Sequence, residues 1–342
     1  MHFTKLFQLA NNGSLADYAK IAKRLKTTNP RNNKGTTPLH VAAASGQLAI
    51  FEYIFKRART IKEQCPQNIE GITPFHMAAE NGHITRLLEF LADPMHSSRL
   101  FILANYGSLT NYITIAEKHE IVNPKDENDG TTPLHLAAES GQLAIFEYVF
   151  QKIEVKCPET NEGITPFHLA AKNGHFAICE LIITNPHVTN KNPKDPTWKT
   201  PFHWAAENGF VNICHLIILY SDDKNPGNLM GITPLHVAAS KGHLSICQLI
   251  IENIGEDKNP RELRQNNTPF HFAALNGHAS VCQLFLNHID NPQPTNSYGD
   301  TPFQWALERR KLEVCELILQ HIGNMVYNET LHSEEFLIQK VL

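Results

Sequence analysis

The sequence predicts an all-α solenoid, in which helix-turn-helix units stack and are separated by β-hairpin or loop fingers. The tetrapeptide Thr-Pro-(Leu/Phe)-His occurs seven times, and an eighth copy at Thr301 ends in Gln304 instead of His. Successive threonines are 36, 59, 33, 35, 33, 35 and 33 residues apart. A fixed period of this size indicates stacked repeats, because each unit buries its apolar face only against its neighbours. The seven threonines are Thr37, Thr73, Thr132, Thr165, Thr200, Thr233 and Thr268.

Each unit carries start and stop signals for two short helices, as the copy at residues 163–183 illustrates. Thr165 is a suitable N-cap, and Pro166 then falls in the first turn, where its missing N–H costs nothing. Asn173-Gly174 supplies the left-handed turn that ends this helix. The apolar pattern from Phe176 onward predicts a second helix with a broad buried stripe.

The segment Thr233 to Ala239, Thr-Pro-Leu-His-Val-Ala-Ala, resembles the ankyrin repeat, as do Gly242-His243 and the 33-residue step. Eight such copies cover nearly the whole chain. The resemblance implies an ankyrin-repeat solenoid that binds protein partners on its concave face. It therefore implies a non-enzymatic interaction scaffold or adaptor.

A duplication explains the 59-residue step. Residues 36–55 and 131–150 are identical at 17 of 20 positions, and the cap-like stretch 6–15 resembles residues 100–109. We expect the internal cap-like repeat to pack on the repeat before it, with a local change of curvature near residues 93–99; a break in the stack there is the alternative. The predicted organisation is one array of about ten repeats over residues 1–342, comprising a cap and two repeats at 1–95, a degenerate cap-like repeat and six repeats at 96–322, and a tail or capping helix at 323–342.

The cysteines indicate a reducing compartment. Five of the seven recur at one position of the second helix, flanked by Ile, Val and Leu, which predicts small buried core residues. No apolar run is long enough to span a bilayer, and residues 1–20 lack a signal-peptide pattern. We therefore expect a cytoplasmic protein, with the nucleus also open. The five cysteines are Cys179, Cys214, Cys247, Cys282 and Cys315.

Histidine is the residue type that most resembles a reactive set, but its periodicity indicates a structural role. We expect each Thr-Pro-X-His histidine to bond the turn backbone near its threonine. Three His/Cys pairs have the four-residue spacing of two zinc ligands on a helix, yet two ligands per unit favour core packing over metal. With no catalytic motif, we expect no enzyme, cofactor, metal or small-molecule substrate. The pairs are His175/Cys179, His243/Cys247 and His278/Cys282.

The partner-binding residues are expected where the repeats differ, at the fingertips and just after the Ala-Ala pair. Trp198 stands where glycine is expected, and other apolar residues occupy similar places. Exposed Trp, Tyr and Met in one band are typical of interface anchors. The alternative is that Trp198 folds back onto its own finger. The predicted partner-binding set is Trp198, Leu229, Met230, Leu275 and Tyr298.

Charge is unevenly distributed along the chain. Residues 1–62 hold eleven Lys and Arg against two carboxylates, whereas the whole chain has a net charge of −4. This basic end is either a solvated surface or a tether to an anionic partner, such as acidic lipid or nucleic acid. A pathogen effector that acts on host proteins is a third possibility, and a monomer is expected. The predicted anionic-partner patch is Lys20, Lys23, Arg24, Lys26, Arg31, Lys34, Arg57 and Arg59.

Overall fold

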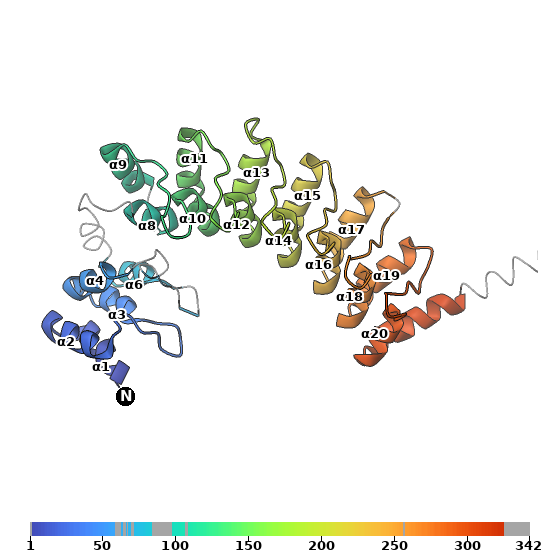
Figure 1. Ribbon diagram of the computed structural model, residues 1–342, viewed down its shortest axis with the longest axis horizontal. Helices are drawn as coiled ribbons and strands as arrows, with labels where there is room; N and C mark the ends of the chain where they lie inside the picture. Colours follow the sequence, from blue (N-terminus) through green and yellow to red (C-terminus); the bar gives the residue numbers. More distant parts are fainter. Residues whose placement is uncertain are drawn as a thin grey trace, which may run out of the picture. The chain divides into compact units, whose positions relative to one another are not determined.

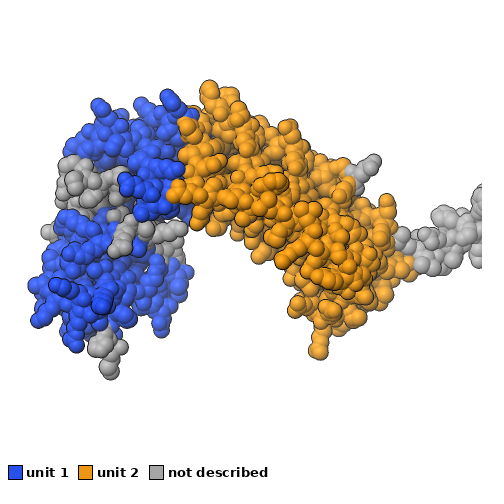
Figure 2. Space-filling view, in the orientation of Figure 1, with its two compact units in different colours: residues 1–154 blue, residues 155–342 orange. Residues whose placement is uncertain are grey.

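The computed structural model describes residues 2–58, 63, 66, 68–69, 72–83, 98–106, 109–255 and 257–324. In these ranges every regular element is a helix, and helix pairs alternate with loops along the chain (Figure 1). The chain divides into two compact units, Met1–Glu154 and Val155–Leu342 (Figure 2). The predicted all-α repeat solenoid is confirmed.

In unit 1 the first helices of successive repeats pack on one another. Helix α3 packs on α1 and α6, and α10 packs on α8. The helices of unit 1 are α1 (His2–Asn12), α2 (Leu15–Leu25), α3 (Pro38–Ala44), α4 (Leu48–Phe55), α6 (Pro74–Glu80), α8 (Ser98–Tyr106), α9 (Leu109–His119), α10 (Pro133–Ser140) and α11 (Leu143–Lys152).

Unit 2 is a regular stack in which α12, α14, α16, α18 and α20 form one layer and the longer second helices form another. Residues 312–324 are also helical and follow α20. The helices of unit 2 are α12 (Pro166–Asn173), α13 (Phe176–Thr184), α14 (Pro201–Asn208), α15 (Val211–Tyr220), α16 (Pro234–Lys241), α17 (Leu244–Asn253), α18 (Pro269–Asn276), α19 (Ala279–His288) and α20 (Pro302–Glu308).

The first helix of a repeat starts and stops where the sequence predicts. In α12 the N-cap is Thr165, and Gly174 ends the helix with φ +79°. The backbone N–H of Thr165 donates to Nδ1 of His168 at 3.2 Å, so the histidine side chain caps the first turn of the helix. In the last repeat Gln304 does the same through Oε1, which accepts from the N–H of Thr301 at 2.7 Å. The periodic histidine is therefore a structural residue of the turn.

The core lies between the two helix layers. Alanine pairs such as Ala170 and Ala171 are fully buried, which lets neighbouring first helices approach closely. In the second helices the five periodic cysteines are buried, free thiols, as predicted. Burial raises the pKa of the Cys179 thiol, for example, and a protonated buried thiol is neither a nucleophile nor a metal ligand at neutral pH.

The fingers are hairpin-like turns without assigned strands in the residues described. In the finger before α16, the N–H of Asn228 donates to the carbonyl of Ile232 at 2.9 Å, and the N–H of Gly231 donates back to Asn228 at 2.8 Å. This closes a tight loop that projects from the helix layers.

The predicted sub-arrays 1–95 and 96–322 stay a prediction. Their boundary and most of the expected bend at residues 93–99 lie outside the described residues. The helix that begins at residue 312 runs to residue 324, into the start of the predicted tail at 323–342. Residues 325–342 lie outside the described residues.

Candidate functional site

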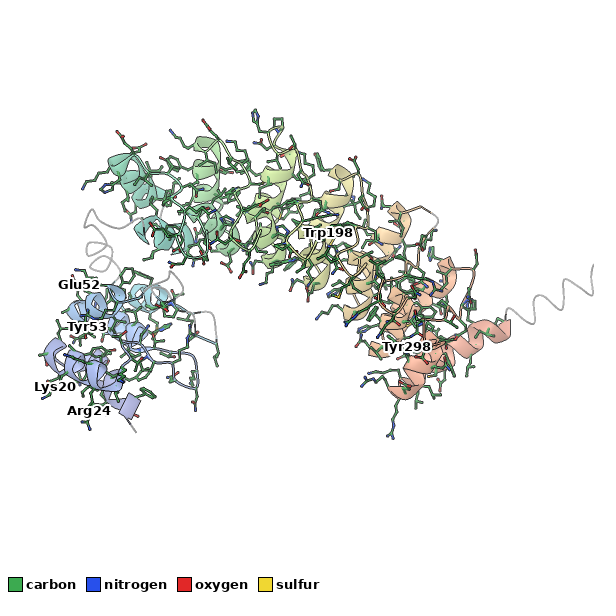
Figure 3. All side chains as sticks on the ribbon, in the orientation of Figure 1. Lys20, Arg24, Glu52, Tyr53, Trp198 and Tyr298 are labelled. Carbon is green, nitrogen blue, oxygen red and sulfur yellow. The ribbon has the colours of Figure 1, made fainter. Side chains whose placement is uncertain are left out.

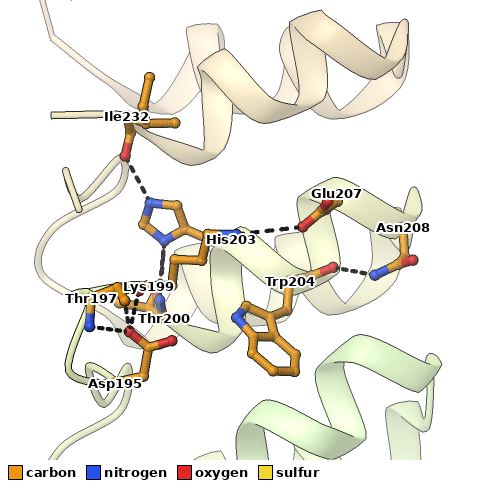
Figure 4. A network of polar contacts seen from close by, with 9 residues as sticks. All are labelled: Asp195, Thr197, Lys199, Thr200, His203, Trp204, Glu207, Asn208 and Ile232. Carbon is orange, nitrogen blue, oxygen red and sulfur yellow. Dashed lines mark hydrogen bonds and ion pairs between the residues drawn. The ribbon is translucent and has the colours of Figure 1, made fainter. Parts of the chain in front are cut away.

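The fingertips of unit 2 are built by one recurring device, a polar side chain that caps its own turn. The Oδ1 atom of Asp195 accepts the N–H of Thr197 at 2.8 Å and of Lys199 at 2.9 Å (Figure 4). Asn228 and Asn296 cap the equivalent turns with bonds of 2.9–3.0 Å. Such side-chain turns hold the intervening residues out from the finger in a defined conformation.

Five large apolar side chains project from these turns and form what we call the fingertip ridge. Figure 3 labels two of them, Trp198 and Tyr298, on the loops of unit 2. The members and their exposed fractions are Trp198 48%, Leu229 53%, Met230 50%, Leu263 75% and Tyr298 71%.

The ridge contains four of the five predicted partner-binding residues and one that sequence reasoning missed. Leu263 follows Glu262 as Leu229 follows Asn228, a correspondence that the extra residue in its finger obscured. The remaining predicted residue, Leu275, is half-buried on α18, just after the Ala-Ala pair as the sequence places it, and its role in partner binding stays a prediction.

Backbone hydrogen bonds tie each finger to the next. The N–H of Leu229 donates to the carbonyl of Thr197 at 3.0 Å, and the N–H of Leu263 donates to that of Met230 at 2.8 Å. The N–H of Ser297 donates to the carbonyl of Gln265 at 2.8 Å. Because these bonds fix the spacing between tips, the ridge is preorganised before any partner arrives.

Trp198 lies in a backbone conformation that disfavours its side chain. Its φ is +62°, whereas the matching place in other fingers is held by glycine, as in Gly163, Gly231 and Gly299. A bulky residue in the left-handed region is an outlier that costs on the order of 1 kcal/mol or more. The ring is half-exposed, and Nζ of Lys194 lies 4.5 Å from its centroid.

A second apolar feature, the inner stripe, runs along the first helices of unit 2. Its members come directly after the motif histidine, or after Gln304 in the last repeat, and are all half-buried: Leu169, Trp204, Val237, Phe272 and Trp305. The two tryptophans are partly buried against the motif histidine of the preceding repeat: the ring centroids of Trp204 and His168 are 5.8 Å apart, and those of Trp305 and His271 are 5.3 Å apart. Nε1 of Trp204 is buried and has no hydrogen-bond partner (Figure 4).

The histidines beside the stripe are neutral linkers between repeats. In His203, Nδ1 accepts from Thr200 at 3.1 Å, so the ring proton sits on Nε2 and is donated to the carbonyl of Ile232 at 3.0 Å (Figure 4). Burial lowers the pKa of His203 to about 4. A histidine with both nitrogens engaged is unavailable for acid–base chemistry.

The His/Cys pairs also have structural partners. Nε2 of His243 lies 3.2 Å from the carbonyl of Glu207, and Nε2 of His278 lies 3.0 Å from that of Ser240, each in the preceding repeat. These bonds explain the recurring histidine after the turn glycine. Among the described residues, no group of three or more His, Cys, Asp and Glu is placed to hold a metal ion.

The structure divides the predicted anionic-partner patch. Four of its members line one cavity of unit 1, namely Lys23, Lys26, Arg31 and Arg57. All seven described members of the patch are exposed, but Lys20, Arg24 and Lys34 are not among the residues that line this cavity. Arg59 lies outside the described residues.

A family model for ankyrin repeats (3 copies) matches residues 58–157, 100–195, 167–262 and 254–329. No curated protein matches the chain. Within the described residues, no helix combines the length and the apolar character needed to cross a membrane.

Proposed function

The chain belongs to the ankyrin-repeat family, and from this premise we propose that it is a non-enzymatic scaffold or adaptor that binds a partner protein through the fingertip ridge of unit 2. Ankyrin repeats are generally protein–protein interaction modules, which supports the class of function. The ridge supplies the large, rigid apolar side chains that dominate such interfaces.

The observation that carries the proposal is the conformation of Trp198. A tryptophan held at φ +62° with 48% of its surface exposed costs stability in the free protein. A partner that covers the ring would bury its apolar surface, and this burial would offset the cost of the backbone conformation. The same reasoning does not apply to Asn266, which has φ +57° but is a residue type that tolerates this region.

The partner we propose presents an apolar surface. The ridge offers aromatic and aliphatic side chains, and one cation, Lys194, stands over the Trp198 ring. Binding through such a surface depends only weakly on salt. The free thiols of the described cysteines support a reducing setting, cytoplasmic or nuclear. We propose that the protein acts as a monomer and without a small-molecule substrate.

Crosslinking mass spectrometry on tagged protein tests the proposal. The test variant is Trp198→Ala/Met230→Ala/Tyr298→Ala, which removes three ridge members. The control is Leu219→Ala/Leu312→Ala/Leu319→Ala, whose members are 62%, 65% and 57% exposed and lie outside the ridge. We expect a set of partners that the control retains and the test variant loses. Retention of the same partners by both folded variants would exclude the ridge.

Trp198→Gly separates binding from stability. Glycine adopts φ +62° without strain, so the free energy of unfolding is expected to stay level or rise by up to about 1 kcal/mol. Affinity for the partner found by crosslinking is expected to fall by about 2 kcal/mol, as for an anchor residue. Urea denaturation and titration measure the two quantities, and Asn266→Gly is the matched control that should leave affinity unchanged.

A further inference from the structure

A cavity of about 830 Å³ lies in unit 1 between the end of α2, the loop that follows it and the end of α4. A cavity of this size is in the range that holds a small molecule. Four cationic side chains line it, together with the hydroxyl residues Thr27 and Thr28. The four cations come from three segments of the chain: Lys23 and Lys26, then Arg31, then Arg57.

Cations outnumber carboxylates among the described residues that line this cavity. Glu63 is the one carboxylate residue there, and Lys23, Lys26, Arg31 and Arg57 are the cations. Among the described residues, Lys56 pairs with Glu52 and Lys199 with Glu207, and neither of these ion pairs involves Lys23, Lys26 or Arg57. Several like charges held together in a concave site favour the entry of an anion.

Arg57 is already oriented. Its guanidinium carbon lies 3.8 Å from the centroid of the Tyr53 ring, and Nη1 donates to the carbonyl of Tyr53 at 3.3 Å. Tyr53 is in turn held by an edge-to-face contact with Tyr18, with ring centroids 6.1 Å apart. A planar guanidinium fixed in this way is suited to bidentate contact with phosphate oxygens.

The chain contains its own comparison site in the duplicated block. Tyr148 takes the place of Tyr53, with Lys152 5.9 Å above its ring, and it contacts Tyr112 edge-to-face at 6.2 Å. At this second place the cation above the tyrosine is kept, but the charges at the end of the preceding helix are reversed. Lys23 and Lys26 correspond to Glu117 and Glu120, and Thr27 and Thr28 correspond to Ile121 and Val122.

The reversal shows that the fold does not need these positive charges. Lysines near a helix C-terminus normally stabilise it by interacting with the terminal carbonyls. Yet Lys26 and Glu120 end α2 and α9 with φ of +53° and +54°, and each N–H bonds the carbonyl three residues earlier. Since the same turn forms with either charge, the basic character of the first copy has another cause.

We propose that this cavity binds a small anion that carries two or more phosphate groups, with Lys23, Lys26 and Arg57 as the principal contacts. Multiple phosphates match several cations in one concave site, and the threonine hydroxyls add donors. A single-stranded nucleic acid fits less well, because base stacking needs free aromatic faces and Arg57 covers one face of Tyr53. The proposal is independent of the fingertip ridge.

Titration calorimetry of the full chain with inositol hexakisphosphate tests this directly. Wild type is expected to bind one equivalent, with affinity that falls as salt rises. Lys23→Glu/Lys26→Glu, which installs the residues of the second copy, is expected to weaken binding by about tenfold or more. Lys20→Glu/Arg24→Glu changes the net charge equally on α2, where Figure 3 labels both residues, but lies outside the cavity. It is expected to weaken binding by less than about threefold.

A second arm distinguishes the source of the phosphates. Phosphatidylcholine vesicles with and without 5% phosphatidylinositol bisphosphate are mixed with the protein and sedimented. If the protein cosediments with the bisphosphate vesicles and the soluble hexakisphosphate abolishes this, the phosphates belong to a lipid headgroup. If the protein does not cosediment, the ligand is a free anion. Both results agree with binding of several phosphate groups in the cavity and differ only in the molecule that bears them.

Three results would overturn the proposal. The first is no binding of the hexakisphosphate by wild type at millimolar concentration. The second is equal weakening by the two charge-reversal variants, which would mean diffuse attraction and no site. The third is binding of a single-stranded oligonucleotide that the hexakisphosphate does not displace. Circular dichroism of each variant confirms that the helices have formed.

Discussion

The block at residues 6–58 and its duplicate at residues 100–153 form the same scaffold with different surfaces. The hydroxyl of Tyr18 donates to the carbonyl of Thr28 at 2.5 Å, and that of Tyr112 donates to the carbonyl of Val122 at 2.6 Å. In both copies an asparagine caps the next first helix: Oδ1 of Asn29 accepts from the N–H of Leu39, and Oδ1 of Asn123 accepts from that of Leu134, each at 3.0 Å. The contacts that make the repeat have been kept while the charges around them changed.

The copies differ in what covers their first helix. Gln8 on α1 is exposed, whereas Ile102 at the same place on α8 is 2% exposed and belongs to one buried cluster with Phe75 and Ala78 of α6. A helix face that meets water is stabilised by polar residues, and one that a neighbouring repeat covers is stabilised by apolar residues. The neighbour, and not the helix itself, therefore decides which residue is tolerated.

The largest effect is expected from protonating the buried, neutral histidine of the Thr-Pro-X-His motif. Burial lowers the pKa of His168, His203 and His236 from 6.5 to about 4. The unfolded chain therefore binds protons first, so stability is complete above pH 6.5 and is lost as pH falls toward 4. Each histidine contributes up to about 3 kcal/mol of this loss.

Urea denaturation between pH 7 and pH 4 measures this dependence. The control is His168→Gln/His203→Gln/His236→Gln, because Gln304 shows that glutamine caps the helix without titrating. The variant should be less stable at pH 7, since it loses bonds to the next finger, but its stability should vary less with pH. An unchanged pH slope would show that these histidines are not its source.

The next largest effect tests the difference in coverage. Ile102→Gln places an amide against the cluster that holds Phe75 and Ala78, and is expected to cost about 3 kcal/mol of unfolding free energy. The reverse change, Gln8→Ile, lies on an exposed face and should alter stability by less than about 0.5 kcal/mol. If urea denaturation gave equal changes for the two variants, Ile102 would not be buried against α6.

The smallest effect tests the shared scaffold in each copy separately. Tyr18→Phe and Tyr112→Phe each remove one buried hydroxyl bond and leave a carbonyl unpaired, at an expected cost of about 1–2 kcal/mol. The two costs should agree, because the bond lengths and burial of the two rings match. Hydrogen exchange in α2 and α9 locates each loss, and a large difference between copies would show that the scaffold has diverged.

Much of the fold could be predicted because the residues that define each repeat lie close together in the sequence. The N-cap threonine, the proline after it and the glycine at the helix end act within a few residues of one another, as Thr165, Pro166 and Gly174 show. The periodic cysteines and the duplicated block also follow from spacing alone. Structural features that depend only on contacts within one repeat can therefore be predicted from the sequence.

The candidate sites depended on contacts between distant segments. Leu263 joins the fingertip ridge because its N–H donates to the carbonyl of Met230, 33 positions earlier in the chain. Leu275, predicted at the place after the Ala-Ala pair, lies half-buried on α18 and stays a prediction. Sequence alone marked the basic end. Only the stacking of α2 on α4 selected the four cations that share one cavity, because burial and proximity are set by neighbours that the local sequence does not encode.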